Sequence, residues 1–226
     1  MNHAGKKGRG GAGSGGGGAA NARNARVARV LRIIGGSWRG RKLRFPPSPE
    51  IRPTPDRVRE TLFNWLGYRL PGARCLDLFA GSGALGLEAL SRGAAHVTFV
   101  ERDVAAVREL RARLAEWAAT GGKVEQVDAL RFLGRAGGAG GSGTGTGQPF
   151  DIVFIDPPFG SDLLAEASVR LEEGHWLAPG ALIYMECAAR QGLPPLPPGW
   201  SVTKAKQAGE VGYHLLTRAQ RGPEGE

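Results

Sequence analysis

The sequence predicts an α/β protein whose core is a seven-stranded, mostly parallel β-sheet that ends in an antiparallel hairpin. Two observations support this prediction. From Arg74 onward, short apolar runs alternate with helical patterns, which is typical of right-handed βαβ units with helices on both faces of a sheet. The last two apolar runs, residues 200–206 and 211–217, are joined by residues 207–210. This link is too short for a crossover helix, so we expect the two runs to pair antiparallel.

The individual elements follow from the local pattern along the chain. Residues 30–34 and 38–43 are separated by Gly35-Gly36-Ser37 and resemble a basic β-hairpin with a glycine-rich turn. Thr54-Pro55-Asp56 is typical of a helix start with Thr54 as the N-cap, and apolar residues follow at helical spacing up to Leu66. The other predicted strands are CLDLF, HVTFV, KVEQV, FDIVFI and ALIYMEC, and the helices between them are GLEAL, VAAVRELRARLAEW and residues 163–171.

Two glycine-rich stretches interrupt this pattern and divide the chain. Residues 1–28 have almost no branched apolar side chains, cannot recover the entropy of being ordered, and are predicted to be disordered. Residues 134–148, GRAGGAGGSGTGTGQ, are predicted to form a flexible surface loop. The remainder divides into an N-terminal basic hairpin and helix, residues 29–70, and one sheet-forming domain, residues 71–221.

Positive charge is concentrated at one end of the chain. The net charge is +9, but residues 1–49 hold eleven Lys or Arg and no acid, whereas the rest carries nineteen bases and twenty-one acids. A basic arm on a near-neutral body favours a polyanionic partner, with nucleic acid ahead of an anionic membrane surface. Such tails can also serve only to keep a protein in solution, so the charge alone does not assign a function.

Composition also indicates the compartment. No apolar run approaches the roughly 20 residues that span a bilayer, and the N-terminal lysines are not followed by the apolar segment of a secretory signal. Cys75 and Cys187 each lie in an apolar run that is typical of a buried strand, and no Cys or His cluster has metal-ligand spacing. We therefore expect a cytoplasmic protein with free, buried thiols, no metal and no membrane segment.

A glycine-rich segment and two acids predict a nucleoside cofactor. Residues 81–86, GSGALG, fit the pattern GxGxxG between a predicted strand and a predicted helix, and Glu101 ends the next strand. These two features alone would suit a dinucleotide equally well. Asp77 distinguishes a dinucleotide from S-adenosylmethionine. Its carboxylate would repel the pyrophosphate of the former but attract the α-ammonium and sulfonium of the latter.

The remaining parts of this cofactor site follow from the same assignment. Gly81 and Gly83 would let the backbone approach the methionine portion. Glu101 would accept hydrogen bonds from the ribose hydroxyls, and Asp128, just after KVEQV, would accept from the adenine amino group. Three acids at successive strand ends are more than chance placement of exposed loop acids would produce.

The run FDIVFI is directly followed by Asp156-Pro157-Pro158-Phe159. The two prolines remove two N–H donors and leave carbonyls as the available backbone groups. An exocyclic base amine is a poor nucleophile because its lone pair is delocalised, so a catalyst has to accept its hydrogens and turn the lone pair toward the methyl donor. The Asp156 carboxylate and the Pro157 carbonyl can do this, and the carboxylate also stabilises the charge that develops on nitrogen. Phe159 would stack on the extruded base.

With these motifs the sequence resembles the bacterial 16S ribosomal RNA guanine-N2 methyltransferases of the RsmD type. The resemblance extends from about Arg32 to Arg218 and includes RIIGGSWRGRKL, RPTPDRVRETLFNWL, LDLFAGSGALGLEALSRGA, DIVFIDPPF, WLAPGALIYMEC and GEVGYHLL. It implies a class I, Rossmann-like methyltransferase domain over residues 71–221 that methylates N2 of guanine 966 in 16S ribosomal RNA. The substrate would be the small ribosomal subunit or an assembly intermediate, and we expect a monomer.

The resemblance also implies roles for particular residues. The segment from Thr54 to Glu60 is similar to the element that closes the cofactor pocket, and residues 156–159 to the catalytic loop. The tail and the 134–148 loop depart from the family pattern. The implied cofactor contacts are Asp77, Gly81, Gly83, Glu101 and Asp128, and the implied RNA contacts lie on the basic hairpin: Arg32, Arg39, Arg41, Lys42 and Arg44.

Other functions remain open at this point. A DNA adenine or cytosine N-methyltransferase uses a similar loop but usually has a sizeable target-recognition domain, for which we see no room. A protein methyltransferase acting on glutamine would more often have Asn in place of Asp156. A non-catalytic RNA-binding assembly factor would not need the cofactor and catalytic motifs together. An NAD oxidoreductase would leave Asp77 and the DPPF motif unexplained.

Overall fold

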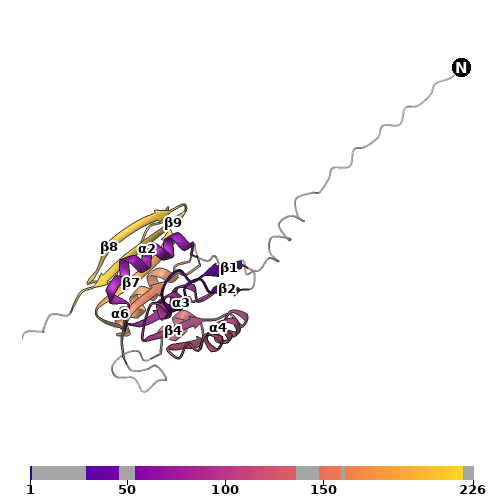
Figure 1. The fold of residues 1–226 in the computed structure, drawn as a ribbon. Helices are drawn as coiled ribbons and strands as arrows, with labels where there is room; N and C mark the ends of the chain where they lie inside the picture. The colour runs from indigo at the N-terminus through magenta and orange to yellow at the C-terminus, as the bar shows by residue number, and fades with distance from the viewer. Residues whose placement is uncertain (2–28, 46–53, 136–147, 159–160, 221–226) are drawn as a thin grey trace, which may run out of the picture.

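The computed structural model describes residue 1 and residues 29–45, 54–135, 148–158 and 161–220 of the chain (Figure 1). The predicted tail and most of the predicted 134–148 loop lie outside these residues. The described elements in chain order are β1 (Arg29–Arg32), a 3-10 helix (Gly36–Trp38), β2 (Lys42–Phe45), α2 (Asp56–Leu66), a 3-10 helix (Gly67–Arg69), β3 (Arg74–Asp77), α3 (Ala84–Ser91), β4 (His96–Glu101), α4 (Val104–Glu116), β5 (Gly122–Gln126), α5 (Ala129–Leu133), β6 (Phe150–Ile155), α6 (Leu163–Glu173), β7 (Leu177–Ala188), β8 (Trp200–Ala208) and β9 (Val211–Arg218).

The main sheet has seven strands in the order β5-β4-β3-β6-β7-β9-β8. Strands β3 to β7 pair in parallel, whereas β9 is antiparallel to both β7 and β8. The last strand of the chain is therefore inserted between β7 and β8. The predicted fold class, a mostly parallel seven-stranded sheet with an antiparallel terminal hairpin, is confirmed.

Helices cover both faces of the sheet, because successive residues of a strand point to opposite faces. One core joins Cys75 and Phe154 to the buried faces of α2, α3 and α4. The other joins Leu76, Ile155 and Cys187 to the buried faces of α5 and α6. Both cysteines are buried and not disulfide-bonded. Across the described residues, no helix has the length and apolar character needed to cross a bilayer.

The N-terminal hairpin is antiparallel as predicted, and the glycine-rich part of its connection begins a 3-10 helix over Gly36–Trp38. The β1–β2 ladder ends at the pair Arg32–Lys42, although Ile33 still donates to the Arg41 carbonyl and accepts from the Gly40 N–H. Residues 34–39 form the connection, which contains the first 3-10 helix. Figure 1 shows this hairpin beside α3. Gly36 has φ +74°, and a Cβ there would lie 1.8 Å from the Ser91 carbonyl oxygen of α3, so only glycine fits.

A buried carboxylate of α3 binds the hairpin connection. Glu88 on α3 is fully buried and accepts hydrogen bonds from the N–H groups of Ile34 and Gly35, both at 2.8 Å. It also accepts one from Arg92 Nε at 2.8 Å. These tertiary hydrogen bonds hold the glycine-rich connection against α3.

The predicted helix start at Thr54 also needs correction. Helix α2 begins at Asp56, Pro55 occupies the N-cap position, and no side chain caps the helix. The Thr54 hydroxyl instead donates to Glu186 Oε1 at 3.0 Å. Asp56 stabilises the first turn, because its carboxylate lies 2.6 Å from Arg59 Nη2 and near the positive end of the helix dipole. A long-range hydrogen bond has taken the side chain that local capping would have used.

The loops after β3, β4 and β6 all lie at the carboxyl edge of the parallel strands. In the loop between β3 and α3, Gly81 (φ +50°) and Gly83 (φ +74°) have left-handed backbone conformations that favour glycine. Gly83 is the N-cap of α3. Ligands of open α/β sheets bind outside this edge. The fold therefore places the predicted cofactor and catalytic motifs on one side of the molecule.

Candidate active site

A cavity of about 470 Å³ lies at this edge of the sheet, against the N-terminus of α2. Its walls come from the ends of the parallel strands and the loops after β3, β5 and β6, and the β8–β9 hairpin adds Ala208 and Val211. Among the predicted cofactor and catalytic residues that the structure describes, all except Gly83 line it. The volume falls in the range of sites for small-molecule cofactors, which is roughly 300–1,000 Å³.

Asp77 forms the floor of the cavity beside the glycine loop. The residue is 3% exposed, and its carboxylate accepts a hydrogen bond from the Gly86 N–H at 2.9 Å. Burial raises the pKa of Asp77 to about 7; the Gly86 N–H lowers it and the charge of Glu101 raises it. An opposite charge nearby favours the ionised form of such a carboxyl group. The position therefore suits a ligand that carries positive charge.

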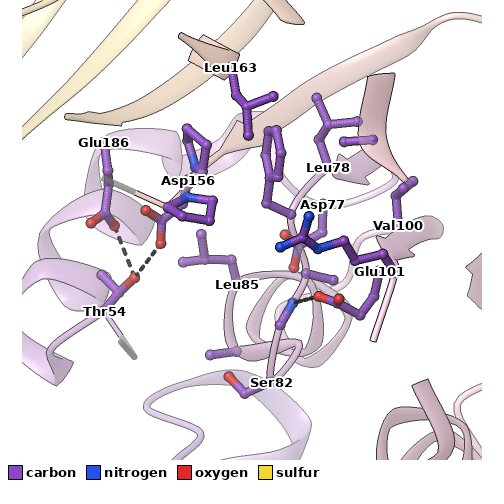
Figure 2. A pocket seen from close by; sticks show the side chains of 18 of the residues that line it. Thr54, Asp77, Leu78, Ser82, Leu85, Val100, Glu101, Asp156, Leu163 and Glu186 are labelled. Carbon is purple, nitrogen blue, oxygen red and sulfur yellow. Dashed lines mark hydrogen bonds between the residues drawn. The ribbon is translucent and has the colours of Figure 1, made fainter. Parts of the chain in front are cut away.

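Glu101 and Asp128 are held in place by backbone N–H groups. Glu101 accepts from Gly81 at 2.8 Å (dashed in Figure 2) and from Asp103 at 2.7 Å, which ties the glycine loop to the end of β4. Asp128 is the N-cap of α5 and accepts from two N–H groups of its first turn, at 3.0 and 3.2 Å. These backbone hydrogen bonds orient both carboxylates. The predicted contacts of Glu101 to ribose and of Asp128 to adenine would be made in addition to them.

Asp156 stands at the opposite side of the cavity, next to α2. The Thr54 hydroxyl lies between two carboxylates, 3.5 Å from Asp156 Oδ2 and 3.0 Å from Glu186 Oε1 (Figure 2). Burial raises the pKa of Asp156 well above its usual value, the charges of Glu186 and Asp77 raise it further, and the Thr54 hydroxyl lowers it. Pro157 is buried directly after it and also lines the cavity.

Glu186 is a cavity residue that the sequence reasoning missed. It lies near the end of β7, is 3% exposed, and also accepts a hydrogen bond from the Tyr184 hydroxyl at 2.7 Å. The signal was present in the run ALIYMEC, where Glu186 is the one acid in an otherwise apolar strand. A buried acid near the carboxyl end of a parallel strand could have been compared with Asp77 and Glu101, which occupy the same kind of position.

The predicted RNA contacts do not enter the cavity. Within the described residues, no basic residue of the hairpin lines it. The Arg41 guanidinium stacks over the Trp117 ring at 5.4 Å, and Trp38 packs against the same ring at 5.2 Å, so α4 anchors the hairpin connection. The side chains of Phe159 and Arg44 lie outside the described part. The exposed basic residues of this hairpin are Arg32, Arg39, Arg41 and Lys42.

The described residues give no sign of a metal site: nowhere among them do three or more His, Cys, Asp or Glu side chains gather in a way that could hold an ion. The acids of the cavity are distributed along it instead. They lie on β3, on and after β4, after β5, after β6 and on β7. Such a row suits an elongated organic ligand with several polar groups better than a single ion.

The pKa of Asp77 predicts a pH-dependent affinity for S-adenosylmethionine. As the pH falls below about 7, the carboxyl becomes protonated and loses its attraction for the cationic methionine portion. The dissociation constant should therefore rise below pH 7, by at most about tenfold per pH unit. The same raised pKa affects the folding stability of the free protein in the opposite direction. It stabilises the folded state at pH values below the usual pKa of 3.8, and this stabilisation is lost as the pH rises through about 7.

Titration calorimetry between pH 5.5 and 8.5 measures this dependence. The Asp77→Asn variant is the control, because its amide has the same shape and does not titrate in this range. The variant should bind more weakly at pH 8 and show a flat profile. An equally steep profile in the variant would show that another group is responsible.

The sheet order with an inserted antiparallel strand, and the acid-lined cavity at the carboxyl edge of β3 and β4, define a class I methyltransferase fold. The solved structure of the Escherichia coli protein yhhF superposes with a TM-score of 0.75 at 48% identity, covering 84% of this chain and 99% of that one. An RNA methyltransferase from Salinibacter ruber, solved in complex with S-adenosyl-L-homocysteine, shares the fold with a TM-score of 0.52 at 17% identity, covering 77% of this chain and 98% of that one.

Sequence comparison gives the family. The model of the family described as conserved hypothetical protein 95 matches residues 31–217, so the chain belongs to this family. Ribosomal RNA small subunit methyltransferase D of Escherichia coli strain K12 is 50% identical over 190 residues, which cover 84% of this chain and 91% of that protein. The resemblance to methyltransferases of the RsmD type is thereby confirmed.

Proposed function

We propose that this protein transfers a methyl group from S-adenosylmethionine to N2 of a guanine in 16S ribosomal RNA. The substrate is the small subunit or an assembly intermediate, and the enzyme acts as a cytoplasmic monomer. The observation that carries the proposal is that one cavity joins Asp77 and Glu101 at one side to Asp156-Pro157 at the other. The relative named ribosomal RNA small subunit methyltransferase D supports ribosomal RNA as the substrate class.

The residues present fit S-adenosylmethionine. A buried carboxylate at Asp77 matches the cationic methionine portion, whereas it would repel a pyrophosphate. Glu101 would hold the ribose and Asp128 the adenine, and the left-handed glycines bring the backbone close to the methionine end. When bound, the cofactor supplies an electrophilic methyl group on its sulfonium.

The residues of the chain prepare the base amine for reaction. Asp156 accepts a hydrogen of the amine together with the Pro157 carbonyl, which turns the nitrogen lone pair toward the methyl donor. As the nitrogen–carbon bond forms, positive charge develops on the nitrogen, and the carboxylate stabilises it. Asp156 then takes the proton that the methylated amine releases. The raised pKa of Asp156 makes it a better proton acceptor than an exposed carboxylate.

The test is to identify the modified nucleoside. Small-subunit particles that lack base methylation are incubated with the protein and isotope-labelled S-adenosylmethionine, and the RNA is digested for mass analysis. We expect one labelled N2-methylguanosine per particle. Label in a different nucleoside, in ribosomal protein or in DNA would refute the assignment of the substrate, whereas no label with any acceptor would argue against catalysis.

The basic hairpin should act on turnover through RNA positioning. Replacing Arg39, Arg41 and Lys42 by glutamine should lower kcat/KM for the particle by on the order of tenfold to a hundredfold and leave cofactor affinity unchanged, because these exposed residues lie outside the cavity. The salt dependence of RNA binding should become shallower by about two to three units of log K per log salt.

A matched triple variant controls for net charge. Arg108, Arg111 and Arg131 are exposed on α4 and α5, and their replacement by glutamine removes the same charge elsewhere on the surface. This control should alter kcat/KM much less than the hairpin variant. Equal losses in both variants would mean that overall charge, and not the hairpin, determines how the RNA is held.

A further inference from the structure

The outer strand β8 carries an exposed surface that the transfer of the methyl group does not use. In the sheet order β8 is an edge strand, and its residues 201–207 are exposed. Since neighbouring side chains of a strand point to opposite faces, both faces of β8 are exposed over this length. The exposed run SVTKAKQ contains two lysines, Lys204 and Lys206, and no acid. It therefore presents positive charge at this edge of the sheet.

The two lysines lie on the face of the sheet that α2 covers. In the antiparallel register, Lys204 is opposite Leu215 of β9, and Lys206 is opposite Tyr213. Residues that are directly opposite in such a pair point to the same face. Leu215 and Tyr213 belong to the core that includes the buried face of α2. Both lysines therefore point to the side of α2, next to the part of β9 that this helix covers.

An aromatic ring of α2 borders the same surface. Trp65 is only half-buried, and its ring stacks on that of Tyr213 with centroids 5.5 Å apart and planes at 29°. Figure 1 shows α2 beside the hairpin of β8 and β9. Because Lys206 is opposite Tyr213, Trp65 and Lys206 are both neighbours of this tyrosine. Positive charge next to an accessible aromatic ring is typical of surfaces that bind single-stranded nucleic acid.

This surface is continuous with the cavity. Strand β8 ends at Ala208, which lines the cavity together with Val211 of β9. Lys206 and Lys204 precede Ala208 by two and four residues, which corresponds to about 7 and 14 Å along an extended strand. Alternate residues of a β-strand and successive phosphates of an extended RNA strand have similar spacings. The lysines are therefore within reach of the nucleotides next to a base that occupies the cavity.

We propose that Lys204, Lys206 and Trp65, together the β8 surface, bind the RNA strand on one side of the methylated base. This inference rests on the proposed function and adds an RNA contact to that of the N-terminal hairpin. The lysines contact phosphates, so they position the strand without reading its sequence. A strand of a protein could also pair with the β8 edge, but two lysines without an acid favour a polyanion.

The direct test moves both lysines to the other face of the same strand. Residues 204–207 are KAKQ, and the variant Lys204→Ala, Ala205→Lys, Lys206→Gln, Gln207→Lys changes them to AKQK. Composition, net charge and the number of lysines on the edge stay the same, and all four positions are exposed. The value of kcat/KM for small-subunit particles should fall by on the order of tenfold, because two phosphate contacts are lost.

Two further readouts accompany the rates. The salt dependence of RNA binding should become shallower by roughly 1 to 2 units of log K per log salt, since each neutralised phosphate contributes about 0.7 to 0.9. The affinity for S-adenosylmethionine should stay within about threefold of the wild type, because the altered residues lie outside the cavity. Thermal unfolding verifies that the variant is folded.

Photochemical crosslinking gives the location of the strand. A benzophenone side chain is placed at position 206 or, as the matched control, at position 207, which points to the opposite face. In complexes with small-subunit particles, position 206 should crosslink to RNA within about two nucleotides of the methylated base, as the distance along β8 requires. Position 207 should give far less of this product.

The outcomes separate this inference from the function on which it rests. If the wild type forms N2-methylguanosine and the AKQK variant is equally active, the lysines serve only to keep the edge strand from pairing, and the inference is wrong. Crosslinks from position 206 to a ribosomal protein instead of RNA would also overturn it. If the wild type methylates a different nucleoside, the proposed function fails, whereas the crosslinks still show whether β8 contacts RNA.

Discussion

Replacing Asp156 by alanine should reduce kcat by on the order of a hundredfold or more and change the affinity for S-adenosylmethionine by less than about threefold. The reason is that the proposed mechanism uses Asp156 to orient the amine and to receive its proton, whereas it assigns the cofactor contacts to Asp77, Glu101 and Asp128. Single-turnover methylation of small-subunit particles gives the chemical step, and calorimetry gives the affinity.

Two further variants sharpen this expectation. Asp156→Asn keeps a carbonyl acceptor but has no charge to stabilise the nitrogen, so its activity should lie between wild type and Asp156→Ala. Asp162→Ala changes an exposed acid a few residues further along the same connection and should be nearly as active as the wild type. Near-normal turnover of Asp156→Ala would refute the mechanism, because the mechanism requires this carboxylate to orient the amine and to accept its proton.

Removal of the Glu88 side chain should give the largest loss of stability. Arg59 and Glu88 are both fully buried, with Arg59 Nη1 3.5 Å from Glu88 Oε2. Arg59 also donates from Nη2 to the Arg32 carbonyl at 2.8 Å, so the pair joins the hairpin, α2 and α3. Glu88→Ala would leave the buried Arg59 guanidinium with the largely exposed Asp56 as its remaining described ion-pair partner, and would remove the acceptor of two hairpin N–H groups. The cost of breaking such a pair is about 3–5 kcal/mol in the free energy of unfolding.

Urea unfolding measures this loss, and an exposed pair provides the control. Arg113 Nη1 and Glu116 Oε2 on α4 are 2.6 Å apart, but the Glu116 side chain is 61% exposed. Glu116→Ala should therefore lower the free energy of unfolding by about 1 kcal/mol or less. The double variant Arg59→Met, Glu88→Ala should lose less than the sum of its single variants, because it removes both charges together. If Glu88→Ala unfolds at the same urea concentration as Glu116→Ala, the buried pair does not hold the hairpin.

The fold class, the order of the elements and most of the residues that line the cavity could be predicted from the sequence. The reason is that these depend on local signals: alternating apolar runs specify parallel strands, and a short link such as residues 207–210 permits only an antiparallel pair. Glu101 and Asp156 could be found because each directly follows a predicted strand, and Asp77 because it is the acid within the predicted strand ahead of the glycine-rich segment. The carboxyl ends of parallel strands meet at one edge of a sheet whatever the details of packing.

Features that depend on contacts between distant segments could not be predicted from local patterns and are seen only in the folded chain. Thr54 was expected to cap its own helix, but its hydroxyl bonds to Glu186, 132 residues away in the sequence. The sequence predicted a glycine-rich connection in the hairpin, but not that Glu88 of α3 would accept hydrogen bonds from the N–H groups of Ile34 and Gly35. In each case a buried carboxylate accepts hydrogen bonds from donors that the local structure could have used. The reason is that a buried carboxylate without hydrogen bonds costs more free energy than an exposed backbone group that water can solvate.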